Sequence, residues 1–402
     1  MQNFRRLWFF GLLIAAYLGV AVSYSKVYLV HLFLALAPIF LIKNLLSVSL
    51  LRRNWIFLFW IGYFLLSTLW AQMPRAALNY NVMVLLGGTL AMSMSFEEHE
   101  DKMIWKILGI LTVLSLGVGL IESFTTFQYP ISKYSPYLSY FKKAVVDADT
   151  SEPYPTSFFW TANNFSFMLI VSLPFYSLIK NKRQQIVMTL ITLILIVRTS
   201  SRGIMALALA YFLYRLIHVL FKGQERRKVI SIVLASFLIF IPIAYFTTSS
   251  DNILEIKTVH DVLNKQAHFY TSLITGDEND AYPRTRRDEM LFQTIGLWKQ
   301  HKVFGSGAGQ LQGKYGQFDG KPLDISTPHQ YWAELLTYGG LFFLIIFLAW
   351  VVQCLRKLKL KPAKEALVLF ILAAPACSTL VYFFPAWMFL GLINRLSETR
   401  EP

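Results

Sequence analysis

The chain has 402 residues, of which 55% are hydrophobic and only 15% are charged. Because soluble domains carry about 25% charged residues, this composition argues against a soluble protein. The net charge of +15 would suggest a nucleic-acid partner in a soluble protein, but in a membrane protein it reports orientation, so we expect no nucleic-acid partner.

Long apolar runs predict an all-α polytopic membrane protein, because a spanning helix needs roughly 17–25 mostly apolar residues. The candidate spans, in chain order, are 7–22, 27–42, 54–71, 76–95, 103–122, 157–179, 185–200, 203–221, 229–247 and 331–353. The last region, 364–393, suits one tilted helix or two short ones, and Pro385 favours a break there. The expected total is about 12 transmembrane helices, or about 11 if the last region stays whole.

Basic residues predict the orientation of these helices. If the N-terminus lies in the cytoplasm, 19 of the 38 Lys and Arg residues fall in short inside connections, as in the run from Arg356 to Lys364. The short outside connections contain only Lys26, Arg75 and Arg202. This asymmetry follows the positive-inside rule and places both termini in the cytoplasm. The first apolar run continues into further apolar runs, so we expect it to be a retained helix rather than a cleaved signal.

Two longer segments are expected outside, 123–156 and 248–330. The second is the only sizeable non-membrane region, and its stretch 285–303 is amphipathic enough to form a helix. The predicted organisation is therefore a block of transmembrane helices over 1–247, an outer loop domain over 248–330, and a C-terminal block of helices with a cytoplasmic tail over 331–402.

Several arginines lie where the outer face is expected. Arg202 stands in Thr199-Ser200-Ser201-Arg202-Gly203, between two apolar runs. An arginine at a membrane boundary is costly and usually has a partner or a function, although its side chain can also simply reach the headgroups. Arg284, Arg286 and Arg287 form a cluster in the outer loop. Guanidinium groups bind phosphate through paired hydrogen bonds, but the same cluster also suits a solvated helix start.

The end of the outer loop contains further candidates. Gly305-Ser306-Gly307-Ala308-Gly309 lacks the ending of a nucleotide-binding loop, so we expect a tight turn with close backbone packing. His329 stands just before a span; it can accept a proton as a neutral imidazole or be structural. Glu334 follows, and an arginine is the partner considered for its carboxylate. The scattered histidines and the apolar placement of Cys354 and Cys377 indicate no metal site and no disulfide framework.

Four stretches resemble, in order, motifs of the O-antigen ligase and O-antigen polymerase superfamily of bacterial inner-membrane proteins. They are Phe158 to Phe165 with its paired asparagines, Ser201-Arg202-Gly203, Arg287 followed by Gly305-Ser306-Gly307, and Pro328-His329-Gln330-Tyr331 with Glu334 and Gly339-Gly340-Leu341. The resemblance covers about 155–350. The sequence departs from the pattern at Gln330, where the superfamily usually has Asn, at Lys302, where it has Pro, and at Leu291, where it has an aromatic residue.

The resemblance implies a glycosyltransferase of the GT-C type in the bacterial inner membrane, with its active site facing the periplasm. The implied donor is a glycan on undecaprenyl pyrophosphate, and the implied acceptor is a sugar hydroxyl of lipid A–core. Transfer would invert the anomeric centre, use no metal and need no cofactor. Membrane lipids surround the spans, and apolar spans would form a groove for the polyprenyl tail.

That chemistry assigns expected roles to the matched residues. An anionic pyrophosphate leaving group without a metal needs fixed cations, for which Arg202 and Arg287 are the candidates. The base that helps the acceptor hydroxyl is expected to be His329. The expected substrate-binding residues are Arg284, Arg286, Asn164, Glu334 and Tyr331. Asn164 also suits a helix cap or packing contact, and aromatic residues such as Tyr331 also suit the membrane interface.

The leading hypothesis is an O-antigen ligase. A polymerase or a protein O-oligosaccharyltransferase of the same superfamily would share the donor site, because only the acceptor differs. A lipid-linked glycan transporter is a more remote alternative. Such a transporter predicts charged residues deep in several spans, whereas here the charges collect at one face.

Overall fold

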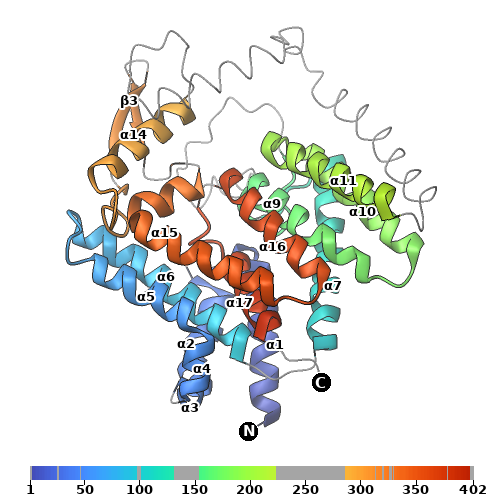
Figure 1. Ribbon diagram of the computed structural model, residues 1–402. Helices are drawn as coiled ribbons and strands as arrows, with labels where there is room; N and C mark the ends of the chain where they lie inside the picture. Colours follow the sequence, from blue (N-terminus) through green and yellow to red (C-terminus); the bar gives the residue numbers. More distant parts are fainter. Residues whose placement is uncertain are drawn as a thin grey trace.

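The computed structural model describes residues 2–24, 27–45, 47–96, 101–130, 154–222, 286–312, 314–318, 321–325, 328, 330–377 and 379–398. Most of these residues form helices (Figure 1). Within the described ranges, four helices are long and apolar enough to cross a membrane: Asn3–Ala21, Pro74–Ser95, Lys102–Phe124 and Tyr331–Lys357. This agrees with a polytopic membrane protein. The total of about 12 spans and the GT-C type stay predictions, and the predicted span 229–247 lies outside the described residues.

The first part of the chain follows the predicted spans closely. Its elements are α1 (Gln2–Leu18), η1 (Gly19–Ala21), β1 (Ser23–Tyr24), β2 (Val27–Tyr28), α2 (Leu29–Ala35), α3 (Ala37–Leu45), α4 (Val48–Arg53), α5 (Trp55–Ser67), α6 (Pro74–Phe96) and α7 (Asp101–Phe124). The short strands β1 and β2 pair antiparallel. The predicted span 27–42 is interrupted at Leu36. Pro38 falls in the first turn of α3, where its missing N–H is tolerated.

The middle part begins later than predicted. Its elements are α9 (Ala162–Ser172), η2 (Leu173–Leu178), α10 (Lys182–Arg198) and α11 (Arg202–Lys222). The predicted span 157–179 contains a turn before α9, because the side chain of Thr161 caps this helix by accepting from the Asn164 N–H. Pro174 stands near the start of η2, where the α-helix gives way to a tighter turn.

The last part contains α14 (Arg286–Gln300), β3 (Tyr315–Phe318), β4 (Lys321–Asp324), α15 (Tyr331–Lys357), α16 (Lys361–Ala373), η4 (Ala374–Ala376) and α17 (Phe384–Glu398). The helix predicted within 285–303 is confirmed as α14. The region 364–393 forms two helices, and Pro385 lies in the first turn of the second. The antiparallel hairpin of β3 and β4 is a small departure from the all-α prediction, since loop backbone outside the helices needs its own hydrogen bonds.

The core is rich in aromatic residues from α5, α15 and α17. The ring of Trp60 lies 4.7 Å from that of Trp387 and 5.3 Å from that of Phe343. A close approach of α6 and α17 supports this packing. A Cβ on Gly391 would lie 2.3 Å from the Ala91 carbonyl oxygen, so only glycine permits the two helices to touch there.

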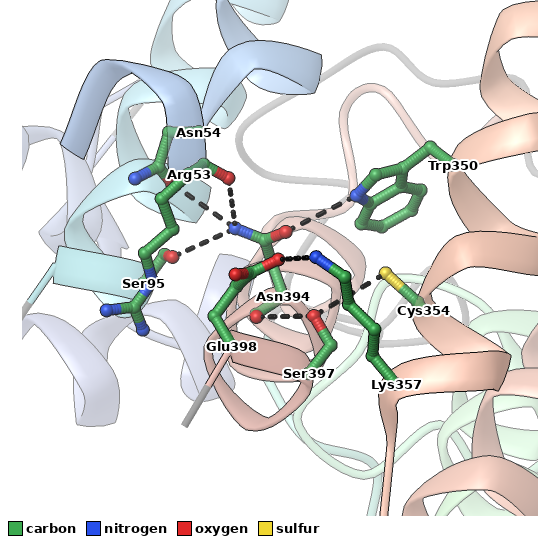
Figure 2. A network of polar contacts seen from close by, with 9 residues as sticks. All are labelled: Arg53, Asn54, Ser95, Trp350, Cys354, Lys357, Asn394, Ser397 and Glu398. Carbon is green, nitrogen blue, oxygen red and sulfur yellow. Dashed lines mark hydrogen bonds and ion pairs between the residues drawn. The ribbon is translucent and has the colours of Figure 1, made fainter. Parts of the chain in front are cut away.

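One end of the molecule, which we call the inner end, brings together the ends of α4, α6, α15 and α17. Figure 2 shows Asn394 of α17 at its centre. The Asn394 amide donates to Arg53 O at 3.1 Å and to Ser95 Oγ at 3.0 Å, and it accepts from Trp350 Nε1 at 3.3 Å. Lys357 pairs with Glu398 at 2.6 Å.

The opposite outer end contains α14, the hairpin and the start of α15, and the chain termini lie toward the other end (Figure 1). The ends of α5 and α7 and the starts of α6 and α9 also reach it. The alternation of the connections between two membrane faces stays a prediction. Which end faces the cytoplasm stays a prediction.

Candidate functional site

Helix α15 is broken near the outer end, at Gly340. This residue has φ 68° and ψ −176°, a conformation open essentially to glycine. The preceding loop supplies hydrogen bonds at the break: Leu341 N donates to Lys302 O and Phe342 N to Val303 O, both at 3.0 Å. Because the broken backbone is paired with protein, it needs no contact with lipid or water.

The glycine-rich loop then packs against three helices. Ser306 N donates to Thr337 O at 2.8 Å, and Ala308 N donates to Ser67 Oγ at 3.0 Å. A Cβ on Gly309 would lie 2.5 Å from Ala76 O. The predicted tight turn with close backbone packing is therefore confirmed for Gly305 to Gly309, and its function is to hold α5, α6 and α15 together.

The start of α15 is fixed by its cap and by a buried carboxyl group. Gln330 accepts from the Ala333 N–H through its side chain, so it supplies the cap despite departing from the superfamily's Asn. Glu334 is 3% exposed and accepts from Thr379 Oγ1 at 3.1 Å. Within the described residues, the Glu334 carboxyl pairs with the Thr379 hydroxyl and not with the arginine considered from the sequence.

Tyrosines surround the Glu334 carboxyl. Those close enough to interact with it electrostatically are Tyr80, Tyr331, Tyr338 and Tyr382. The Tyr80 hydroxyl faces the carboxyl, but neither that hydroxyl nor Glu334 Oε2 has a partner in good hydrogen-bond geometry within the described residues. A buried polar atom without a full partner costs about 1–3 kcal/mol, so this cluster is a candidate for a functional role.

A second buried carboxyl organises the other side of the outer end. Glu122, at the end of α7, accepts from Tyr129 N at 2.9 Å, Thr156 N at 2.7 Å and Ser157 N at 2.6 Å. Ser157 has φ +51°, so the turn before α9 is held in the left-handed region by these bonds. The carboxyl fixes where α9, with Asn164 in its first turn, begins.

Arg202 lies beside this turn system, at the start of α11. Arg198 Nη2 donates to Ser123 O at 3.0 Å, which ties the end of α10 to α7. Ser200, with φ +53°, then reverses the chain into α11. Arg202 is exposed and Ser201 is buried. An exposed guanidinium at the positive end of a helix suits an anionic ligand.

Of the predicted site residues, the structure describes some completely, some only by their backbone and some not at all. His329 and Arg284 lie outside the described residues. Arg286 and Arg287 form the first turn of α14, and only their backbone is described. Tyr331 is buried beside Glu334. Asn164 does not cap α9 as considered from the sequence: the cap is Thr161, whose side chain accepts from the Asn164 N–H, because Asn164 lies inside the first turn. The roles assigned to these residues stay predictions.

Three residues that contribute to the outer end were missed from the sequence: Tyr80, Thr379 and Glu122. Tyr80 and Thr379 carry no local signal, since each becomes meaningful only beside Glu334. Glu122 had a signal, because a carboxylate at the end of an apolar span needs partners.

Residues 187–348 match the family model described as O-antigen ligase. The predicted resemblance is confirmed. The matched segment contains Arg202, the start of α14, the glycine-rich loop and the broken helix α15, which are the outer-end elements described above.

A curated relative extends the similarity beyond this segment. The chain is 24% identical over 381 residues to the teichuronic acid biosynthesis protein TuaE of Bacillus subtilis (strain 168). The alignment covers 86% of this chain and 72% of that protein. The similarity to this relative therefore extends over most of the chain, beyond the segment 187–348 that matches the family model.

Proposed function

We propose that this protein transfers a glycan from undecaprenyl pyrophosphate to a sugar hydroxyl at the periplasmic face of the inner membrane. Our first candidate for the acceptor is lipid A–core, which makes the protein an O-antigen ligase. The observation that carries the proposal is exposed Arg202 at the N-terminus of α11, inside the segment that matches the O-antigen ligase family.

The chemistry follows from the leaving group. When the acceptor oxygen attacks the anomeric carbon, the bond from that carbon to the phosphate oxygen breaks and negative charge grows on the pyrophosphate. A fixed guanidinium at a helix N-terminus stabilises this charge without reorganising. In our proposal Arg202 and Arg287 bind the pyrophosphate, and His329 takes the acceptor's proton. No metal is required in this scheme, which stays a prediction.

A second candidate is polymerisation, in which the acceptor is another lipid-linked glycan. The observation that favours it is the relative named for teichuronic acid biosynthesis. The donor half of the reaction is the same in both candidates, so Arg202 keeps its role and only the acceptor differs.

The test is transfer by the purified full chain in liposomes, given a labelled undecaprenyl-pyrophosphate glycan and either lipid A–core or unlabelled lipid-linked glycan. Label on lipid A–core supports the ligase, and longer lipid-linked chains support the polymerase. Chelator should leave the rate unchanged. Movement of the donor across the bilayer without any transfer would contradict the enzyme and support the transporter.

A further inference from the structure

The outer end consists of two halves. The α15 half contains α5, α6, α14, α15 and the glycine-rich loop, and the α9 half contains α7, α9, α10 and α11. Residues 374–377 and 379–383, which we call the bridge, lie between the C-terminal helices α16 and α17. The start of the bridge, η4, packs against both α9 and α15.

Aromatic contacts attach the bridge to the α9 half. The ring of Phe383 lies 5.7 Å from that of Phe159, in the turn before α9, and 6.0 Å from that of Phe167 within α9. All three side chains are buried. Each such pair contributes about 0.5–1.5 kcal/mol beyond the area that it buries.

Polar contacts attach the bridge to the α15 half. Thr379 donates to Glu334, and Gln312 Nε2 donates to Tyr382 Oη at 3.0 Å. Tyr382 also packs on Tyr80, with ring centroids 6.5 Å apart. Among these groups Glu334 is the buried carboxyl, and its hydrogen bond reaches the bridge from the first turn of α15.

We propose that Glu334 is a positioning residue that holds the bridge against α15 through Thr379 and so keeps the two halves of the outer end in register. Arg202 belongs to the α9 half, whereas Tyr331 and the cap of α15 belong to the other. A shift of the bridge therefore changes the distance between groups that must act on one substrate. The consequence for catalysis rests on the proposed function, but the consequence for packing does not.

The two cysteines give a direct readout of the packing. Cys377 lies in the bridge and is fully buried, and Cys354 is 1% exposed near the inner end. The experiment measures the rate at which N-ethylmaleimide labels each cysteine in the full chain in liposomes. Glu334→Leu and Thr379→Val remove the hydrogen bond at similar side-chain volume. Both should raise Cys377 labelling by about 10-fold or more through local opening, with Cys354 unchanged.

Conservative variants separate positioning from direct chemistry. Glu334→Gln keeps an oxygen that accepts from Thr379, and Thr379→Ser keeps the hydroxyl. Both should leave Cys377 protected. Glu365→Gln is the matched control, because Glu365 is a half-buried carboxyl, paired with Tyr211 and Arg215, on α16 away from the bridge. It should change neither the Cys377 labelling nor the transfer rate.

The kinetic arm uses the liposome transfer assay. Glu334→Leu and Thr379→Val should lower kcat by roughly 10- to 100-fold with little change in KM, because small misplacements of reacting groups are costly. Glu334→Gln should keep most of kcat. Wild-type labelling of Cys377 in both Glu334→Leu and Thr379→Val would overturn the proposal. So would an inactive Glu334→Gln with Cys377 protected, since the carboxylate would then act directly.

The two cysteines also separate unfolding of a variant, and failure of the proposed glycan transfer, from failure of the role proposed for Glu334. If Glu334→Leu exposes both cysteines, the variant is unfolded and Thr379→Val decides. If the wild-type chain transfers no glycan to any acceptor, the proposed function fails, while the labelling of Cys377 still decides whether Glu334 holds the bridge.

Discussion

The Asn394 amide at the inner end and the Glu334 carboxyl at the outer end are both buried, but they are paired to different extents. At the inner end, both groups of the Asn394 amide are used by backbone, indole and hydroxyl partners from three other helices or their connections (Figure 2). At the outer end, Glu334 Oε2 and the Tyr80 hydroxyl lack a partner in good geometry within the described chain.

This difference indicates different tasks. A satisfied buried amide specifies how helices pack, because any other arrangement leaves its partners unpaired. An incompletely paired carboxyl persists only where the surrounding packing holds it, and such groups concentrate at functional sites. The Asn394 amide thus specifies helix packing at the inner end, whereas the Glu334 carboxyl at the outer end keeps one oxygen without a partner in good geometry within the described residues.

The strongest way to break the outer end is Gly340→Ala. A Cβ at Gly340 would lie 2.2 Å from the Val303 carbonyl oxygen, and φ is positive. Because backbone cannot move aside as a side chain can, we expect a loss of stability above about 4 kcal/mol and little folded protein. Gly296→Ala in α14 is the control, since nothing lies within 4 Å of its added Cβ. Yield and elution volume on size-exclusion chromatography measure the result; a monodisperse Gly340→Ala protein would contradict it.

Arg202→Ala tests the chemistry of the outer end without disturbing its packing. Arg202 is exposed at the start of α11, so stability should be unchanged. Removing one fixed donor to a developing negative charge typically lowers kcat by about 100- to 1,000-fold. Arg215→Ala is the matched control, because Arg215 lies further along α11 and pairs with Glu365 at 3.3 Å. It should keep its kcat. Equal activity of Arg202→Ala and wild type would remove Arg202 from the mechanism.

Asn394→Leu tests whether the inner end contributes to stability and not to transfer. Leucine has a similar size but leaves Trp350 Nε1, Arg53 O and Ser95 Oγ without the amide. We expect a loss of about 1–3 kcal/mol, seen as a lower Tm in detergent. Transfer per folded molecule should stay at the wild-type value. A lower kcat at unchanged Tm would show that the inner end contributes to chemistry, and its role would then not be structural alone.

Much of this arrangement was predictable from sequence, and the limits have physical causes. The apolar helices follow from long apolar runs, which are local signals, and four of them are long enough to cross a membrane within the described residues. The close packing of Gly305 to Gly309 followed from glycine spacing. The break in α15 was missed, because Gly339 and Gly340 become a break only when residues 302–307 pair with it. The Glu334–Thr379 bond joins segments far apart in the chain, for which no spacing rule exists.

The smallest expected effect concerns Gln330, where this chain departs from the Asn usual in the superfamily that it resembles. Its side-chain oxygen accepts from Ala333 N and caps α15. Loss of a cap costs typically about 1 kcal/mol, so Gln330→Ala should lower the Tm slightly. Gln330→Asn should restore or raise it, because Asn is the better N-cap. If Gln330→Asn instead changed kcat at constant Tm, position 330 would take part in binding substrate. Tm and kcat measured on the same three proteins therefore separate capping from chemistry at the residue next to His329.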